Sequence, residues 1–510
     1  MSRSENVWQP YPADRKPEYR PAGVVTDTDE EFDTITLAVQ DSREWPHEEH
    51  SHTSATIRPA LGHLADRNGI ISASTGDAHA IKSILGRAGI PDALLLDQRN
   101  GGHYVTDRET GQPIALLIPG LPRIWFLPPL RDLSPRIRAA EVFAFLDWAW
   151  AHGIAAGDPD QMTFNSWKIT FPPRGFKTWF YPDAHSPGRP PRDLYVTGAE
   201  ADRVVQLPLL GRDQAPQWTL GFHEHATLYD RKMAYPYEMA HGGPFPMQLH
   251  RAHPADRLPE AWEVGIVQVV IHHVPEDLLW SPVPCYFDDH GRKRWSYEKG
   301  TAPDVLTIRE LWLALTSGVD LEIKETYACP ASYYKDNVFT EWFGLCVEAR
   351  ELEHGSRVAK WIANRLWGQL SRMDDFLPWA VEITARHRVT AARQALMVPE
   401  VRAVYAETDG IICTAEDPAA RPEPYGDGPG KWREKPKDGP ADQPALILGE
   451  SAYMWDRGNG KFGYHAETAA KDRPEHCRDL GDKLVGNDPR WLAWRPLVER
   501  DIRKNSRESF

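Results

Sequence analysis

The chain has 510 residues, of which 41 % are hydrophobic and 26 % charged, and its formal net charge is −14. This length suits roughly two to four domains, and the composition is ordinary for a soluble globular protein. The acidic sum argues against a protein that coats nucleic acid through charge alone. It still permits a nucleic-acid enzyme, because the local distribution of charge matters more than the sum.

The sequence predicts no membrane segment, since it nowhere approaches about eighteen consecutive apolar residues, and its polar start lacks the apolar region of a secretory signal. The five cysteines lie far apart, without the spacing of metal ligands or redox pairs. A reducing, cytoplasmic setting fits this pattern. Residues 1–55 are rich in proline, acidic residues and histidine, so we expect a disordered acidic tail whose only candidate strand is residues 35–39.

An α/β domain is predicted for residues 56–215. Residues 77–85 read as a short helix, and residues 93–96 and 114–118 read as strands. A longer helix is predicted over residues 135–152, because a serine cap, a first-turn proline and a terminal glycine all stand in their usual places.

The first segment with chemical interest is a short predicted strand that ends at Asp230, with Tyr235 five residues later after a turn. Taken alone, a structural turn is the commoner interpretation. If a second acidic segment faces it, an aspartate at a strand end can bridge two divalent cations about 3.5–4 Å apart, which assist phosphoryl transfer.

A predicted helix places Lys360, Asn364, Trp367 and Gly368 on one face. This face combines a cation for phosphate, an aromatic plane for a base or sugar, and a glycine for close approach. Arg350, on a preceding helical segment, can add a phosphate contact. The alternative is an amphipathic core helix whose lysine extends to solvent.

A β-hairpin is predicted where two apolar runs, residues 401–406 and 411–414, flank an Asp-Gly turn. Glu407 and Asp409 lie at its tip, where carboxylates suit a divalent metal and a phosphate-bearing substrate. A solvated acidic turn is the alternative. Residues 416–443, rich in acidic residues, proline and glycine, read as a long surface loop.

A last segment, residues 460–467, carries Lys461 and Tyr464 on a glycine-rich loop. Such a loop can hold a phosphodiester backbone, and an ordinary turn is the alternative.

Together these segments resemble family B DNA polymerases, and most closely the protein-primed branch of small linear-genome phages and linear plasmids. Residues 230–236 are similar to the first palm motif, Asp-x-x-Ser-Leu-Tyr-Pro, and residues 405–410 to the second, Tyr-x-Asp-Thr-Asp-Ser. Residues 360–368 resemble the fingers motif, Lys-x3-Asn-Ser-x-Tyr-Gly. Residues 461–464 resemble the Lys-x-Gly-Tyr motif. The order is the family's order.

The resemblance implies an α+β multidomain fold: a right-hand polymerase with palm, fingers and small thumb, preceded by an α/β N-terminal domain that resembles an exonuclease domain. The short segment between Gly368 and Val401 predicts that an insertion of related phage enzymes, which encloses the template, is missing or reduced. The expected parts are a tail at 1–55, a degenerate exonuclease-like domain at 56–215, a palm with an insert at 216–335 and 376–460, fingers at 336–375 and a reduced thumb at 461–510.

Residue roles follow from the resemblance. Asp230 and Asp409 would be the metal-binding carboxylates for two Mg²⁺ ions, with Mn²⁺ as a substitute, and the carbonyl group of Arg231 would help to hold a metal. Tyr235 would exclude a ribose 2′-hydroxyl, and Glu407 would be a third catalytic carboxylate. The other implied residues are Arg350 and Lys360 for the triphosphate, Asn364 and Trp367 for the nascent base pair, and Lys461 and Tyr464 for the primer strand.

The sequence departs from the family's motifs at several positions. Glu407 replaces an aspartate, Gly410 replaces a serine and Trp367 replaces a tyrosine. None of these changes removes Asp230 or Asp409.

The N-terminal region is where the resemblance is weakest. The Asp-x-Glu spelling of a proofreading exonuclease occurs at residues 29–31 and 107–109, but neither lies on a convincing buried strand. We therefore expect the exonuclease to be degenerate or absent and this domain to be a scaffold or docking surface.

The function implied is template-directed DNA synthesis, in which a nucleotide is transferred from a dNTP to a 3′-hydroxyl or to the hydroxyl of a protein primer. The expected partners are primer-template DNA, dNTPs and a terminal protein, with no membrane. Two alternatives stay open. One is a catalytically weakened polymerase-like protein that serves DNA binding or replication assembly, and the other is a nuclease that uses the N-terminal carboxylates.

Overall fold

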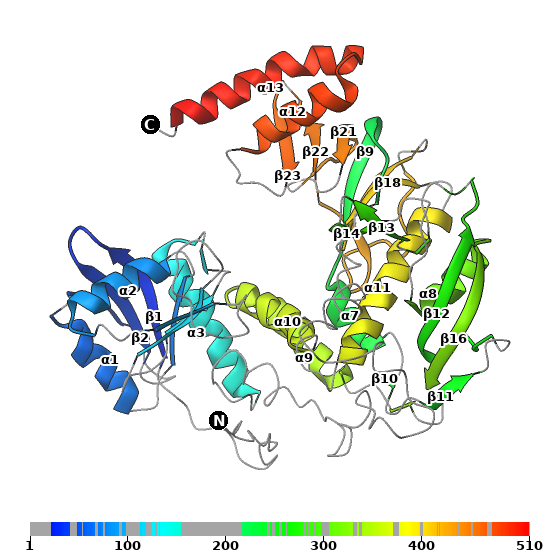
Figure 1. The fold of residues 1–510 in the computed structure, drawn as a ribbon. Coiled ribbons are helices and arrows are strands. Elements are labelled where there is room, and N and C mark those ends of the chain that lie inside the picture. The colour runs from blue at the N-terminus through cyan, green and yellow to red at the C-terminus, as the bar shows by residue number, and fades with distance from the viewer. Residues whose placement is uncertain are drawn as a thin grey trace. The chain divides into compact units, whose positions relative to one another are not determined.

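The chain divides into two compact units, Met1–Phe171 with Val338–Gln369, and Pro172–Asn337 with Leu370–Phe510. Both combine helices and strands (Figure 1). Among the residues that the structure describes, no helix is long and apolar enough to cross a membrane. The computed structural model describes residues 22–40, 48–53, 55–66, 70–74, 77–90, 94–97, 113–118, 124–127, 130–131, 133–152, 154, 217–241, 245–246, 250–253, 258–261, 263–276, 278, 282–283, 285–289, 292–296, 305–329, 334–335, 339–370, 377–397, 401–407, 409–415, 417, 419–435, 439–449, 452–458, 460–466 and 472–508.

The first unit is built on a mixed sheet. Its strands are, in sheet order, β3 (Glu48–Thr53), β2 (Thr34–Gln40), β1 (Ala22–Asp29), β4 (Ile70–Ser74), β7 (Ile124–Leu127), β6 (Pro113–Leu117) and β5 (Leu94–Asp97). The pairs β1–β4 and β4–β7 are parallel, and the remaining pairs are antiparallel. Three helices accompany the sheet: α1 (Ile57–Asp66), α2 (Ala78–Arg87) and α3 (Pro135–Ala151).

Four elements predicted for this unit are confirmed. They are the two helices, α2 and α3, and the two strands, β5 and β6. In α2 the side chains of Ile81, Ile84 and Leu85 are buried, and their i, i+3, i+4 spacing forms the apolar face that packs into the core under the sheet.

The prediction of a disordered tail over residues 1–55 is wrong for residues 22–40 and 48–53. These residues include β1, β2 and β3, of which β2 contains the candidate strand at residues 35–39, and β1 lies inside the sheet between β2 and β4. Val25, Ile35 and Leu37 are buried in the core of the unit. The apolar part of β1 is only a few residues long and runs into an acidic turn, so composition hid it. Residues 1–21, 41–47 and 54 lie outside the described residues, and His50, which is exposed, pairs with Glu48.

Two helices from later in the chain, α9 (Thr340–Arg350) and α10 (Ser356–Leu370), belong to the same unit. The buried carboxylate of Glu141 on α3 accepts the backbone amides of Gly355 and Arg357 at 3.0 and 3.1 Å, at the start of α10. Gly355 has a φ of +98°, and a Cβ there would lie 2.9 Å from the amide nitrogen of Phe145. The chain enters α10 through a glycine because a Cβ at this position would clash with the backbone of α3.

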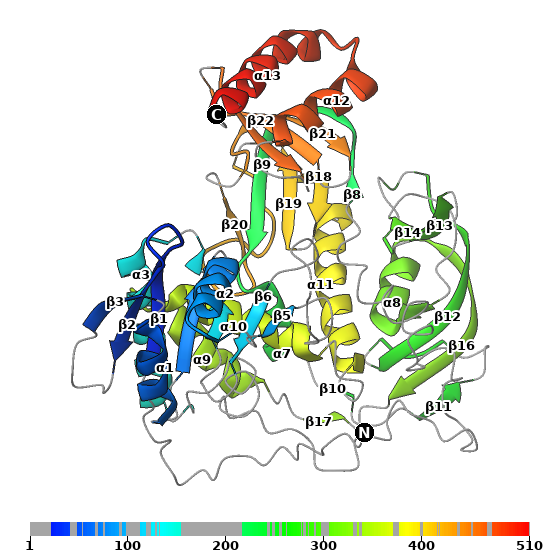
Figure 2. The same ribbon diagram turned by 60° about the vertical axis from the view of Figure 1, so that its left-hand side comes forward.

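The second unit contains an antiparallel sheet of eight strands. Their sheet order is β23 (Phe462–Ala466), β22 (Ala452–Asp456), β21 (Gln443–Gly449), β9 (Gly221–Arg231), β19 (Gly410–Thr414), β18 (Arg402–Glu407) and β8 (Gln217–Trp218), and β20 (Trp432–Glu434) also pairs with β9. Figure 2 shows β9, β19 and β18 side by side. Helices α7 (Ala234–His241) and α11 (Leu377–Met397) contact each other, and α11 also contacts β18.

A C-terminal helical pair packs on one end of this sheet (Figure 1). It consists of α12 (Arg473–Val485) and α13 (Pro489–Glu508). Trp491 of α13 and Cys477 of α12 are fully buried against Leu446 and Met454 of the sheet. A Cβ on Gly481 would lie 2.5 Å from the Trp491 ring, so glycine permits the close approach of the two helices.

A smaller sheet completes the unit, with α8 (Ile308–Thr316) packed on it. Its strands are β11 (His250–His253), β16 (Asp320–Cys329), β12 (Val264–His273) and β15 (Val305–Thr307). Two further strand pairs are β10 (Phe245–Pro246) with β17 (Tyr334–Lys335), and β13 (Cys285–Asp289) with β14 (Arg292–Ser296).

Two expectations about loops in this unit are wrong in part. The predicted surface loop at residues 416–443 contains β20, which pairs with β9, and its Trp432 is fully buried. The glycines and prolines around β20 favour a loop in the sequence, so this short strand beside Asp230 was not predicted. The predicted loop at residues 460–467 is also largely a strand, because residues 462–466 form β23.

Candidate active site

Two acidic segments that are distant in the sequence are neighbours in the sheet of the second unit. β9 ends with Asp230 and Arg231, and the hairpin of β18 and β19 turns at Asp409. Within the hairpin Glu407 pairs with Gly410, and Gly410 pairs with Asp230. The amide of Arg231 donates to the carbonyl oxygen of Asp409 at 2.9 Å. The predicted hairpin is thus confirmed, and its tip lies beside the end of β9.

The carboxylate of Asp230 is in an unusual electrostatic environment. The residue is 8 % exposed. Burial raises the pKa of Asp230 above its ordinary value, and the negative charge of Asp409 raises it further. Lys435 and Arg433 oppose this rise but do not cancel it. The site therefore concentrates carboxylate charge in a poorly solvated place, where a cation binds favourably.

Two basic residues that sequence reasoning missed lie against Asp230. Nζ of Lys435 is 3.1 Å from Oδ1, and Nη2 of Arg433 is 3.5 Å from Oδ2. Both belong to β20 or follow it directly, and Arg433 pairs with Asp230 across the strands. The signal that could have found them is the alternation in Trp432-Arg433-Glu434-Lys435, which puts both cations on one face of a strand.

The donor atoms at this site are oxygens, the kind of ligand that a hard divalent cation binds. Two carboxylates, those of Asp230 and Asp409, and the carbonyl group of Arg231 offer oxygen ligands, which Mg²⁺ prefers. Burial raises the pKa of Asp230 most and the charge of Asp409 adds to the rise, and a cation would relieve this repulsion between the two carboxylates. In the described part of the chain, no group of three or more histidine, cysteine or acidic side chains could hold a metal ion. The side chain of Glu407 lies outside that part.

The residue after Asp230 fixes the backbone of the site. The guanidinium group of Arg231 is buried, donates from Nε to the carbonyl oxygen of Gly430 at 2.8 Å, and forms an ion pair with the buried Glu238 of α7. It also lies over the Tyr237 ring, with Cζ 5.3 Å from the ring centroid. A Cβ on Gly430 would overlap Tyr237 at 2.6 Å, so only glycine allows this packing.

Tyr235 lies in the first turn of α7, five residues after Asp230, as the sequence implies. Its ring is half-buried and faces the imidazole of His387 on α11, with the ring centroids 5.0 Å apart at an angle of 39°. His387 is buried. Sequence reasoning did not single it out, because nothing local relates residue 387 to residue 235.

The four residues expected to bind the nucleotide all lie in the first unit. Arg350 ends α9, and the others are on α10. Lys360 and Asn364 are exposed one helical turn apart, whereas Arg350 and Trp367 are half-buried. The predicted helix and its exposed face are therefore present, in a unit separate from the one that holds Asp230 and Asp409.

The two residues expected to hold the primer strand differ in their surroundings. Lys461 is exposed beside the turn that precedes β23. Tyr464 is half-buried and its hydroxyl donates to Oδ2 of Asp501 on α13 at 2.9 Å. Burial, followed by the charge of Asp501, raises the pKa of Tyr464. A Cβ on Gly463 would lie 2.1 Å from the Trp455 ring, so this glycine has a packing role.

Two acidic residues in the described part of the first unit, Asp29 and Asp77, make structural contacts. Oδ1 of Asp29 accepts the amides of Glu31 and Phe32 in an exposed turn, and residues 107–109 lie outside the described residues. Asp77, near Asp27, forms an ion pair with Arg138 at 2.8 Å. Arg138 also donates to the carbonyl oxygen of Thr26, which ties α3 to β1.

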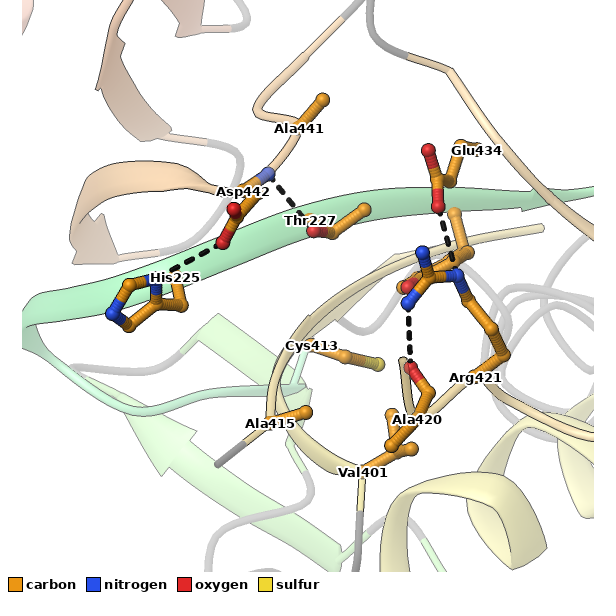
Figure 3. Close-up of a pocket in the computed structure, with 11 residues that line it drawn as sticks. His225, Thr227, Val401, Cys413, Ala415, Ala420, Arg421, Glu434, Ala441 and Asp442 are labelled. Carbon is orange, nitrogen blue, oxygen red and sulfur yellow. Dashed lines mark hydrogen bonds and ion pairs between the residues drawn. The ribbon is translucent and has the colours of Figure 1, made fainter. Parts of the chain in front are cut away.

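A small cavity of about 180 Å³ lies beside β9 of the large sheet, and Figure 3 shows residues that line it. Thr227 and Tyr229 of β9 line it and alternate with Asp230, so they point away from the acidic site. The volume is below the roughly 300–1,000 Å³ of ligand pockets. The labelled lining residues are His225, Thr227, Val401, Cys413, Ala415, Ala420, Arg421, Glu434, Ala441 and Asp442.

Comparison with known proteins gives a structural match without a sequence match. No protein-family model and no curated protein sequence matches the chain. The structure is similar to phi29 DNA polymerase complexed with primer-template DNA, with a TM-score of 0.55 at 12 % identity, covering 90 % of this chain and 94 % of that one. Its ternary complex with incoming nucleotide substrates gives 0.54 at 11 % identity, covering 91 % and 94 %. The chain therefore has the fold of phi29 DNA polymerase.

Proposed function

We propose that this protein is a template-directed DNA polymerase of family B, similar to the protein-primed branch. The observation that carries the proposal is the adjacency of Asp230 and Asp409 at the end of β9, in a chain with the fold of phi29 DNA polymerase. In this proposal the large sheet with α7 and α11 is the palm, α9 and α10 are the fingers, and α12 and α13 form a small thumb.

Asp230 and Asp409, with the carbonyl group of Arg231, would hold two Mg²⁺ ions, for which Mn²⁺ can substitute. Such ions, when bound, activate the attacking hydroxyl and neutralise charge on the departing pyrophosphate. Arg231 links the two acidic strands through the hydrogen bond that its backbone amide donates to the carbonyl oxygen of Asp409, and its buried ion pair with Glu238 ties that backbone to α7. Glu407 would add a third carboxylate to the hairpin.

The remaining residues would bind and orient the substrates. Tyr235, placed by α7 and His387, would exclude the ribose 2′-hydroxyl. On α9 and α10, Arg350 and Lys360 would bind the triphosphate, and Asn364 and Trp367 would shape the pocket of the nascent base pair. Lys461 and Tyr464 would contact the primer strand. Much of the rate acceleration would then come from positioning and electrostatics.

The partners in this proposal are primer-template DNA, dNTPs and a terminal protein whose hydroxyl serves as the first primer. The neighbouring structures are of phi29 DNA polymerase with primer-template DNA and nucleotides. The N-terminal sheet with α1, α2 and α3 would act as a scaffold or docking surface without exonuclease activity. Among the described residues, Asp77 pairs with Arg138, and Asp29 accepts the amides of a turn. Purified protein incubated with 3′-labelled single-stranded DNA should then release no label.

Primer extension tests the main proposal. A labelled primer-template is incubated with Mg²⁺ and dNTPs together with wild type, Asp409→Ala or Asp427→Ala, whose exposed carboxylate makes it the matched control. We expect extension by wild type and by Asp427→Ala, and none by Asp409→Ala. Equal extension by Asp409→Ala would contradict the metal site.

If wild type fails on a DNA primer, the same assay is run with a terminal protein as primer. Failure there as well would contradict the polymerase. Retained, salt-sensitive DNA binding would then favour the second candidate, a catalytically weakened polymerase-like protein that serves DNA binding or replication assembly. The contacts of Lys435 and Arg433 with Asp230 are the observation that supports this second candidate function.

A further inference from the structure

Lys435 and Arg433 occupy both oxygens of the aspartate on which the proposed metal site depends. Nζ of Lys435 lies 3.1 Å from Oδ1 of Asp230, and Nη2 of Arg433 lies 3.5 Å from Oδ2. The side chain of Asp230 is 11 % exposed, whereas those of Lys435 and Arg433 are 29 % and 33 % exposed. The anion is therefore largely enclosed, while both cations remain in contact with solvent.

The backbone holds these cations in place. Arg433 pairs with Asp230 across β20 and β9, and the amide of Lys435 donates to the carbonyl oxygen of Leu228 at 3.0 Å. Glu434, between them, points to the opposite face and pairs with Arg421 at 2.9 Å. The alternation of a strand therefore directs both cations toward Asp230 and keeps the acidic side chain away from it.

A divalent cation that binds Asp230 needs the same oxygens. Because both cationic side chains contact Asp230, they already offset its negative charge without a metal. Lys435 is the cation suited to yield, because an ammonium group on a flexible stem is readily solvated and moved, whereas a guanidinium group is held in a fixed plane. From this geometry we infer that Lys435 is a built-in competitor of the metal at Asp230, which keeps metal affinity low in the free protein. This inference rests on the proposed function.

The same arrangement offers Lys435 a second partner. In the described part of the chain, Nε of Arg433 is buried without a hydrogen-bond partner, so Arg433 has an unused donor beside the acidic site. A phosphate group that arrives there would attract both side chains, since charge-assisted bonds to phosphate are strong. Release of Asp230 by Lys435 would then couple metal binding to binding of a phosphate-bearing substrate.

Metal binding to the full chain, without DNA or nucleotide, tests the inference. Mn²⁺ is titrated into the protein, and free Mn²⁺ is followed by its electron paramagnetic resonance signal. Binding to the Asp230→Asn/Asp409→Asn double variant is subtracted, because an acidic protein also binds Mn²⁺ elsewhere. We expect Lys435→Met to bind Mn²⁺ about tenfold more tightly than wild type, the scale on which neighbours of a metal ligand alter affinity.

Lys431→Met is the matched control. Lys431 is exposed in the same segment, one residue before β20, and its substitution should leave Mn²⁺ affinity unchanged. Equal or weaker binding by Lys435→Met would overturn the inference, as would a change of the same size in Lys431→Met. If Lys435→Met lacks a cooperative thermal transition, Lys435→Gln replaces it with the same expected result.

The outcomes also separate this inference from the proposed function. Binding above background that is the same in wild type and Lys435→Met overturns only the role of Lys435. Absence of binding above background in both proteins overturns the metal site and, with it, this inference.

Discussion

The ring of Tyr235 faces the imidazole of His387, with the ring centroids 5.0 Å apart. One residue belongs to the helix that follows Asp230, and the other to the long helix α11 that packs against it. Because His387 is buried, it limits where the half-buried ring of Tyr235 can move. His387 is therefore a positioning residue for the side chain that is proposed to exclude ribonucleotides.

Replacing His387 by alanine should weaken sugar discrimination. An aromatic pair contributes about 0.5–1.5 kcal/mol, so the ratio of kcat/KM for a dNTP to that for the matching rNTP should fall by roughly two- to tenfold. His387→Phe, which keeps a ring, should retain most of the ratio. The measurement is single-nucleotide incorporation with both sugars. Unchanged discrimination in His387→Ala, beside a loss in Tyr235→Ala, would show that His387 only fills space.

A second contact predicts a stability effect in the first unit. The carboxylate of Glu141 accepts hydrogen bonds from the amides of Gly355 and Arg357 at the start of α10. A negative charge there also interacts favourably with the helix dipole. Glu141→Ala leaves these two amides without that acceptor and should lower the free energy of unfolding by about 1–3 kcal/mol. Urea unfolding followed by circular dichroism measures this. Glu353→Ala, at an exposed residue, should change stability by less than about 0.5 kcal/mol.

The parts of the fold and of the site that could be predicted from sequence are those that a short stretch of sequence specifies. An Asp-Gly turn between two apolar runs predicts a hairpin, and the structure has β18 and β19 there. Cap, proline and glycine signals predict α3. The adjacency of Asp230 and Asp409 was inferred from the order of motifs, since no local rule brings two distant strands together.

The parts that could not be predicted depend on long-range packing or on short strands in unusual composition. β1 and β20 each have only a few apolar residues beside acidic or glycine-rich turns, so they read as a tail and a loop. Their burial comes from neighbours in the sheet, such as β4 for β1 and β9 for β20. Lys435 and Arg433 were missed for this reason, because their importance follows only from the pairing of β20 with β9.

Substitution of Gly463, the glycine of the Lys-x-Gly-Tyr segment, should disturb the packing of the sheet. A Cβ at Gly463 would lie 2.1 Å from the Trp455 ring on the neighbouring strand, and Trp455 is buried. Gly463→Ala should therefore force the indole to move and lower the free energy of unfolding by about 1–3 kcal/mol. Gly344→Ala is the matched control, because it lies in α9 with no atom within 4 Å of the added Cβ. It should leave stability unchanged or raise it by about 0.5–1 kcal/mol. A smaller loss in Gly463→Ala than in Gly344→Ala would contradict this account.

The last prediction concerns pH and the buried ion pairs of α11. Glu382 is buried and pairs with Arg386, at 2.9 Å, and with Arg309 of α8. Burial alone would raise the pKa of Glu382, but Arg309 and Arg386 outweigh it and hold the pKa below the ordinary value of 4.5. A carboxyl whose pKa is lowered by folding contributes stability above its unfolded pKa and loses that contribution as the pH falls through the folded value.

Replacing Arg309 should therefore reduce the dependence of stability on acid pH. Arg309 is 30 % exposed, so Arg309→Met removes one cation without burying a new polar group, while Arg386 remains beside Glu382. We expect the variant to be less stable than wild type at pH 7 and the difference to narrow below about pH 4.5, where the carboxyl in the unfolded chain begins to be protonated. Chemical unfolding from pH 7 to pH 3.5 measures the two curves. Arg495→Met, at a half-exposed arginine of α13 outside this network, controls for general loss of charge. If the free energies of unfolding of Arg309→Met and wild type differ by the same amount at every pH in this range, Arg309 acts on stability through packing and not through the charge of Glu382.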